Sequence, residues 1–154
     1  MRTFYRSLTG ALMVVVLAGC GGSSGSAGSG QARTPAAESP GPALVVERFL
    51  RAANANDLQT MTQLFGTANR TIVQLDGKTR AEERMYVLAS ILRHRDWSIV
   101  GQQTVPGRML DATELLVRIQ KQEREAVVPF LVVRRDEGGW IIERVDIEPL
   151  TTTG

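Results

Sequence analysis

The sequence has very little of the side-chain chemistry from which most metal centres and nucleophilic sites are built. Its 154 residues include one cysteine, Cys20, and one histidine, His94. One cysteine cannot form a disulfide within the chain. One cysteine and one histidine together provide only two of the four ligands of a typical structural zinc site. A phosphate-binding glycine loop is also missing, because no Lys and Ser or Thr follow the glycine-rich stretch. We therefore expect no metal and no other cofactor.

An excess of charge is lacking as well. The chain contains 18 Lys and Arg against 16 Asp and Glu, and two of the basic residues, Arg2 and Arg6, stand close to the N-terminus. Nucleic-acid binding depends on clustered basic residues. We therefore expect no nucleic-acid partner.

The most informative motif is the lipobox Leu17-Ala18-Gly19-Cys20. It follows a positively charged region with Arg2 and Arg6 and a short apolar run over residues 11–18. A bilayer span needs about 20 apolar residues, so the run predicts a cleaved signal peptide over residues 1–19. The alternative is an uncleaved N-terminal helix that buries Cys20 as a small apolar side chain.

This motif is similar to that of bacterial lipoproteins, and the resemblance implies a diacylglycerol on the Cys20 sulfur. Two acyl chains give stable anchoring, so the membrane is a partner through the lipid and the protein belongs to the cell envelope. Residue 21 is glycine, not the aspartate that acts as an inner-membrane retention signal. This favours the outer membrane, on the side that faces the periplasm.

Three further regions follow the signal peptide. Residues 20–42 contain the lipidated cysteine and a tether rich in Gly, Ser and Pro, a composition that behaves as a flexible coil. Residues 43–150 form one domain, which is long enough for a single hydrophobic core. Residues 151–154 are a short tail.

Apolar residues at helical spacing predict three helices in the first half of the domain. The first covers residues 43–55. The second is capped by Asn56 with Gln59, ends at Gly66 and buries Leu58, Met61, Leu64 and Phe65. After a short strand at 71–75, the third begins with a capping box of Thr79 and Glu82 and buries Ala81, Met85, Leu88 and Leu92.

After Arg95 the apolar period changes from 3.6 to 2, which predicts strands over 97–105, 113–122, 126–134 and 140–147. Helices that are segregated from strands in this way indicate an α+β fold. We predict three N-terminal helices packed on one face of a curved, mainly antiparallel sheet, in a cone-like arrangement.

Three stretches carry a resemblance to a known superfamily: RFLRAANANDL at 48–58, DGKTRA at 76–81 and RRDEGGWI at 134–141. In this order they resemble the nuclear-transport-factor-two-like superfamily, a cone-shaped α+β fold that includes ketosteroid isomerase and polyketide cyclases. The resemblance covers residues 43–147. Some members are enzymes and many are binding or assembly modules, so the fold alone does not decide the function.

The resemblance also implies where an isomerase would carry its catalytic groups. Such enzymes need a carboxylate base and an oxyanion hole made from a tyrosine and a protonated aspartic acid. The tyrosine position falls at Phe49 and the acid position near Leu131, and neither side chain can donate a hydrogen bond. Only Asp76 is available as the base. Because two donors of the oxyanion hole are missing, we predict no catalytic residues and keep Phe49 and Leu131 as candidate ligand-lining positions.

The last strand supplies the other candidate ligand residues. A period of two places Arg144 and Asp146 on the same face as Trp140 and Ile142. They either line the cone and hold a polar ligand group or form an exposed pair, and we favour the exposed pair.

His94 also has two interpretations, as a general base or as one of several cations that suit the end of the third helix. We favour the second, because Arg93 and Arg95 flank it.

Two functions remain open at this point. We favour a non-catalytic binding or assembly module, and the alternative is an isomerase- or cyclase-type enzyme that uses Asp76, Asp96 or Asp111 on a small apolar substrate. A carboxylate that points into an apolar cavity would favour the enzyme.

The middle strands are apolar on both faces, whereas a sheet with one solvated face should alternate cleanly. One face of the third strand, for example, carries Val127, Pro129, Leu131 and Val133. We expect a homodimer, an envelope protein partner or a small apolar ligand to cover the apolar surface that the helices leave open.

Overall fold

The structure is a computed structural model that describes residues 41–108, 111–122 and 124–152. The predicted signal peptide, Cys20 and most of the tether lie outside the described residues, as do the last two residues of the predicted tail. Within the described part of the chain, no helix is long and apolar enough to cross a membrane.

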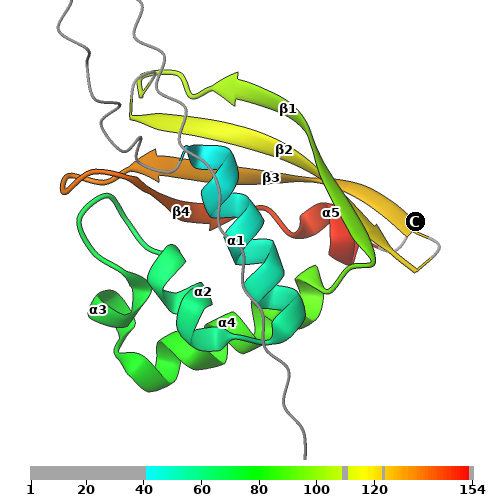
Figure 1. Ribbon diagram of the computed structural model, residues 1–154, viewed down its shortest axis with the longest axis horizontal. Coiled ribbons are helices and arrows are strands. Elements are labelled where there is room, and N and C mark those ends of the chain that lie inside the picture. The colour runs from blue at the N-terminus through cyan, green and yellow to red at the C-terminus, as the bar shows by residue number, and fades with distance from the viewer. Residues whose placement is uncertain (1–40, 109–110, 123, 153–154) are drawn as a thin grey trace, which may run out of the picture. The chain divides into compact units, whose positions relative to one another are not determined.

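The domain is α+β, as the sequence predicts. About half-way along the domain, the helices give way to an antiparallel meander whose strand order is β1-β2-β3-β4 (Figure 1). The elements, in chain order, are α1 Pro42–Ala55, α2 Leu58–Leu64, α3 Ile72–Asp76, α4 Lys78–Leu92, β1 Asp96–Thr104, β2 Ala112–Lys121, β3 Arg124–Arg134, β4 Trp140–Val145 and α5 Glu148–Thr151.

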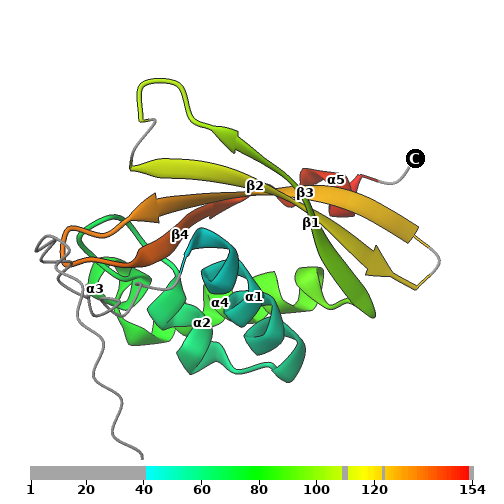
Figure 2. The ribbon, with the colours of Figure 1, turned by 45° about the horizontal axis from the view of Figure 1, so that its top comes forward.

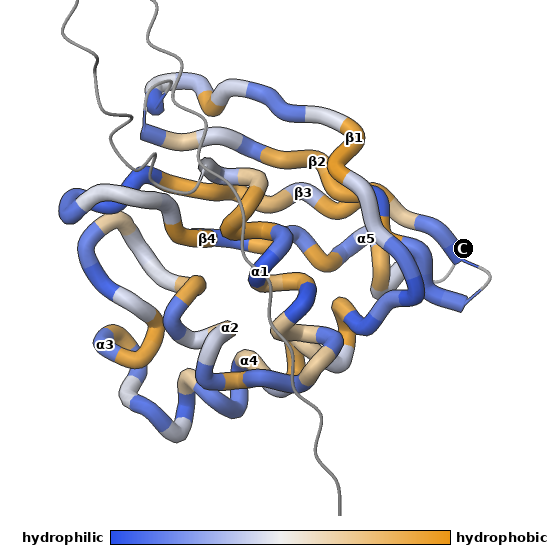
Figure 3. Tube along the Cα trace, viewed as in Figure 1, coloured by the Kyte–Doolittle hydropathy of each residue, from blue (hydrophilic) through white to orange (hydrophobic). Residues whose placement is uncertain are grey.

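The helices before the sheet all lie on one of its sides (Figure 2). The main core fills the space between the two layers. Its largest side chains include Phe49 and Leu50 of α1, Met85 of α4 and Phe130 of β3. Figure 3 shows the apolar segments concentrated in the middle of β2, β3 and β4, with hydrophilic segments at the hairpin ends.

The helix boundaries follow from local chemistry. Pro42 occupies the first turn of α1, where its missing N–H costs nothing, and Asn56 ends the helix in a left-handed conformation. The cap of α2 is Asp57, whose carboxylate accepts a hydrogen bond from the Thr60 N–H at 3.0 Å. The prediction of Asn56 as this cap is wrong by one residue, because Asn56 is used to end the preceding helix.

The predicted strand at 71–75 is also wrong, because Ile72–Asp76 is the short helix α3. Gln74 Oε1 accepts a hydrogen bond from the Thr71 N–H at 2.8 Å, and the Gly77 N–H reaches the Val73 carbonyl at 3.0 Å. These contacts stabilise a short helix of five residues. Five residues are too few to distinguish a helical apolar period of 3.6 from a strand period of 2. α4 then starts at Lys78 after Gly77, so the predicted capping box at Thr79 does not form.

Two register shifts bend the sheet. One lies in β1 between Ile99 and Gly101. The other lies at Glu143 in β4, because Leu131 pairs with Arg144 whereas its neighbour Val132 pairs with Ile142. Neighbours along a strand point to opposite faces. Arg144 is therefore on the face opposite to Ile142, and the prediction that the two share a face is wrong.

The face that the four preceding helices leave uncovered is partly apolar. Val133 and Ile141 are fully buried there in a small cluster with Ala112, against which Val105 and Ala68 pack. Val127 remains 41% exposed and Val100 42% exposed. The loops thus cover one end of this face and leave apolar side chains accessible along the rest.

Candidate functional site

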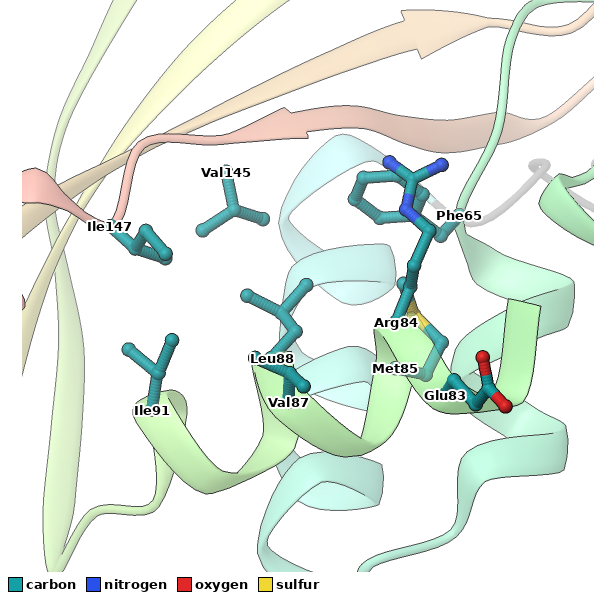
Figure 4. Close-up of a pocket in the computed structure, with 9 residues that line it drawn as sticks. All are labelled: Phe65, Glu83, Arg84, Met85, Val87, Leu88, Ile91, Val145 and Ile147. Carbon is teal, nitrogen blue, oxygen red and sulfur yellow. The ribbon is translucent and has the colours of Figure 1, made fainter. Parts of the chain in front are cut away.

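A groove of about 440 Å³ opens between α4 and the end of β4 (Figure 4). In the figure, side chains of α4 face side chains of the β4 end across the opening. The volume and the predominance of apolar groups are typical of sites for small molecules, which occupy about 300–1,000 Å³. The lining residues are Phe65, Glu83, Arg84, Met85, Val87, Leu88, Ile91, Val145 and Ile147.

One wall of the groove is α4. Met85, Leu88 and Ile91 recur at intervals of three, which places them along one side of the helix. Met85 is buried in the main core, Leu88 and Ile91 are half-buried, and Val87 is 57% exposed at the rim. The predicted stripe Ala81, Met85, Leu88 and Leu92 packs as expected, but Leu88 shares its surface with the groove.

The opposite wall is the end of β4. The register shift at Glu143 brings Val145 to the helix-covered side, where it pairs with Phe130 and packs against the main core. Ile147 follows as the N-cap residue of α5, which begins at Glu148. Without the shift, a strict period of two would direct Val145 to the opposite face.

Phe65 closes one end of the groove and is held in place by the sheet. It forms a single parallel bridge with Ile142, and the adjacent Gly66 N–H donates to the Ile142 carbonyl at 2.9 Å. Its ring lies 6.1 Å from that of Phe49, centroid to centroid. The bridge contacts the outer edge of β4 at Ile142 alone. The groove lies beside the following part of β4, which contains Val145.

The cation at the charged end of the groove is paired within the chain. Arg84 forms an ion pair with Asp76, the last residue of α3. Asp76 does not line the groove. The one carboxylate in the sequence at the position of an isomerase base is therefore paired with a cation beside the groove.

The five residues that the sequence suggested for ligand binding are not brought together. Phe49 is buried in the main core, and Trp140 packs half-buried against the same core. Leu131 and Arg144 pair with each other on the opposite face of the sheet, where the Arg144 side chain is 68% exposed. Asp146 is exposed and accepts a hydrogen bond from the Glu148 N–H at 3.2 Å.

None of those five residues lines the groove. The two polar ones are exposed, as favoured from the sequence, although each has a different neighbour. Arg144 lies 3.9 Å from Glu114, whereas Asp146 contacts the start of α5.

The other titratable candidates are also dispersed. Asp96 is exposed at the start of β1, and Asp111 is exposed before β2. His94 is half-buried after α4, and its Nδ1 lies 2.8 Å from the Leu92 carbonyl. Asn54 holds the backbone of His94 through two hydrogen bonds of 3.1 Å. These contacts give His94 a structural role at the junction of α1 and α4.

The sequence contained one signal for the groove that was not used. Val87 and Ile91 stand one position before Leu88 and Leu92, so the apolar surface of α4 is wider than a single stripe. A helix that packs on one face of a sheet needs only one apolar stripe, so the additional apolar residues indicate a second apolar contact surface on this helix. The Val145 and Ile147 wall has no comparable signal, because it depends on the register shift in β4.

Comparison of the chain with models of protein families, with curated proteins and with solved structures found no match.

Proposed function

We propose that the protein is a non-catalytic binding module held at the bacterial envelope by a lipid on Cys20, and that its groove between α4 and β4 binds a small apolar ligand. The observation that carries the ligand proposal is the groove itself, where seven apolar side chains from three segments surround about 440 Å³. Burial of apolar ligand surface is worth roughly 25 cal/mol per Å².

The arrangement of carboxylates supports binding over catalysis. Asp76 is paired with Arg84, and neither Asp96 nor Asp111 lines the groove. Glu83 is the single carboxylate of the lining, and it is exposed at the charged end. The alternative is an isomerase- or cyclase-type enzyme, which would need a base held against the substrate within about 3 Å.

The proposal extends to the family and to the location. The order of the elements, helices followed by an antiparallel meander, agrees with the nuclear-transport-factor-two-like resemblance. The single bridge between Phe65 and Ile142 adds a short pairing at the outer edge of β4. The lipobox supports attachment to the envelope, with the outer membrane facing the periplasm as the favoured location. The membrane is a partner through the lipid.

A second binding surface is supported by the uncovered face of the sheet. Val127 and Val100 are exposed there, and Leu116, Pro129 and Leu131 are half-buried. Exposed apolar patches commonly mark interfaces, and a twofold homodimer is the commonest association of identical chains. We propose a homodimer on this face, with another envelope protein as the alternative partner.

The groove can be tested with two adjacent exposed residues of α4. Val87 lines the groove and is 57% exposed, whereas Tyr86 is 56% exposed and does not line it. Replacing either residue with Asp places the same charge on the same helix at similar exposure. The probe is N-phenyl-1-naphthylamine, an uncharged dye whose fluorescence rises in apolar surroundings, added to residues 41–154.

We expect saturable binding of the dye to the unmodified protein, at least fivefold weaker binding to Val87→Asp and unchanged binding to Tyr86→Asp. The physical reason is that a carboxylate at the rim of an apolar groove must be desolvated when the ligand binds. Equal affinity of the two variants would contradict the assignment of the groove. Circular dichroism and the melting temperature check that both variants are folded.

A further inference from the structure

The lining of the apolar groove is not uniform along its length. Its residues on α4 run from Glu83 to Ile91, which corresponds to about 12 Å along the helix axis at about 1.5 Å per residue. The two charged residues, Glu83 and Arg84, stand at one end of this series, and the lining residues of α4 that follow them are apolar. The groove is therefore an elongated site with one polar end and one apolar end.

The opposite wall of the groove follows the same order. In Figure 4, Phe65 lies beside the Arg84 side chain, whereas Ile147 lies across from Ile91. Val145 lies between Phe65 and Ile147 along this wall. The lining residues of this wall are all apolar. A ligand that lies along the groove therefore meets charged side chains only at the Arg84 end.

Arg84 retains hydrogen-bond donors at this end. Its Nη1 donates to Asp76 Oδ2, and no other side-chain hydrogen bond of Arg84 occurs among the described residues. A guanidinium carries five N–H donors, and the Arg84 side chain is 55% exposed. A ligand can therefore reach the remaining donors while the ion pair with Asp76 stays intact.

The ion pair with Asp76 decides which head group suits the polar end. Arg84 and Asp76 cancel each other's charge, and Glu83 is the other charged residue of the lining. In Figure 4 the Glu83 carboxylate points away from the wall that Val145 and Ile147 form. A charged head group would lose hydration here without meeting a free counter-charge in the groove. An uncharged hydroxyl or ester oxygen loses less and can still accept a hydrogen bond from Arg84.

We propose that the ligand of the groove is a linear amphiphile with one aliphatic chain and an uncharged head that carries hydroxyl or ester oxygens, the chemistry of a monoacylglycerol. This inference rests on the proposed binding function. The head accepts hydrogen bonds from Arg84, and the chain runs toward Ile91 and Ile147. Asp76 does not line the groove, and it determines specificity by pairing Arg84 and thereby disfavouring carboxylate heads.

The experiment compares three ligands that have chains of equal length and heads of different charge. It uses residues 20–154 with Cys20→Ser, which retain every residue that the structure describes and carry no lipid that would require a bilayer. 1-Monodecanoylglycerol, decanoate and decylammonium each displace N-phenyl-1-naphthylamine at neutral pH. We expect monodecanoylglycerol to bind at least fivefold more tightly than either charged ligand. Equal or tighter binding of a charged ligand would overturn the proposal.

Matched variants isolate the contribution of the site, because an uncharged amphiphile enters any apolar surface more readily than a charged one. Asp76→Asn leaves Arg84 without its carboxylate partner, so we expect decanoate to gain at least fivefold in affinity relative to monodecanoylglycerol. Glu82→Gln is the control, since it removes the acidic partner of Lys78 from an ion pair outside the groove. It should leave this ratio unchanged.

The outcomes separate this inference from the proposed function on which it rests. An unchanged affinity ratio in Asp76→Asn, or an equal change in Glu82→Gln, would overturn the assignment of the head group to Arg84. If the dye still bound and remained sensitive to Val87→Asp, the groove would stand as a binding site for a different apolar ligand. Absence of saturable dye binding would contradict the groove itself. Circular dichroism checks that both variants are folded.

Discussion

At the scale of single residues, the N-cap of α2 by Asp57 is the clearest stabilising interaction. The Asp57 carboxylate accepts hydrogen bonds from the Thr60 N–H at 3.0 Å and the Thr60 hydroxyl at 2.6 Å. We expect Asp57→Ala to lower the free energy of unfolding by about 1 kcal/mol, the usual cost of losing an N-cap. Asp57→Ser retains a capping oxygen and should lose much less. Urea unfolding of residues 41–154 measures both changes, and equal losses would contradict the cap.

The pH dependence of this cap has a definite sign. The hydrogen bonds from the Thr60 side chain and backbone lower the pKa of Asp57 below its ordinary value of 3.8. A lowered pKa in the folded state makes the contribution of the charged carboxylate complete above the ordinary pKa and progressively lost as the pH falls through the folded-state pKa. The difference in stability between the unmodified protein and Asp57→Ala should therefore shrink below about pH 4.

The same residues show what sequence reasoning resolves at this scale. The break between the first two helices was predictable, because Asn-Ala-Asn-Asp favours caps and turns over helix interiors. Which residue caps the second helix was not predictable, because Asn56 and Asp57 both suit that role. The structure uses Asn56 to end α1 in the left-handed conformation and Asp57 to begin α2.

At the scale of elements, the uncovered face of the sheet leads to a prediction about association. Val127 of β3 is 41% exposed on this face. We expect light scattering of residues 41–154 to show a homodimer within roughly 1–100 μM, the range of an interface of modest affinity. Val127→Asp should shift the mass toward the monomer, because it buries an unpaired charge at the interface. Val87→Asp, on the helix layer, is the control and should leave the mass unchanged.

A monomeric mass at all these concentrations would contradict the homodimer and would favour a different protein as the partner on this face. An equal loss of dimer in Val87→Asp would place the interface elsewhere.

The strand and helix assignments also show where elements can and cannot be predicted. The four-stranded meander follows from long segments with a clear period of two. The error at 71–75 arose because Ile72, Val73 and Leu75 fit a strand or a helix equally well over five residues. The register shift at Glu143 carries no sequence signal, yet it decides that Val145 lines the groove and that Arg144 does not share its face.

At the scale of the whole molecule, the first expectation concerns the anchor. The lipobox predicts cleavage between Gly19 and Cys20 and acylation of the cysteine. We expect Cys20→Ser to release the protein from the membrane fraction. Serine has no thiol to carry the diacylglycerol, and the proposed anchor consists of its two acyl chains. Fractionation with a carbonate wash measures the change. Retention of Cys20→Ser in washed membranes would refute lipid anchoring.

The apolar groove brings together α4 and the end of β4. The sequence did not predict this groove, because it depends on side chains that are distant along the chain.

The most direct test of the central claim is native mass spectrometry of the protein purified from its own membranes without added ligand. A binding module with an apolar groove should carry a non-covalent small molecule of defined mass. We predict that this adduct is present in the unmodified protein and in Tyr86→Asp but is lost in Val87→Asp. An adduct that persists in Val87→Asp, or a bare protein mass in every preparation, would contradict the account.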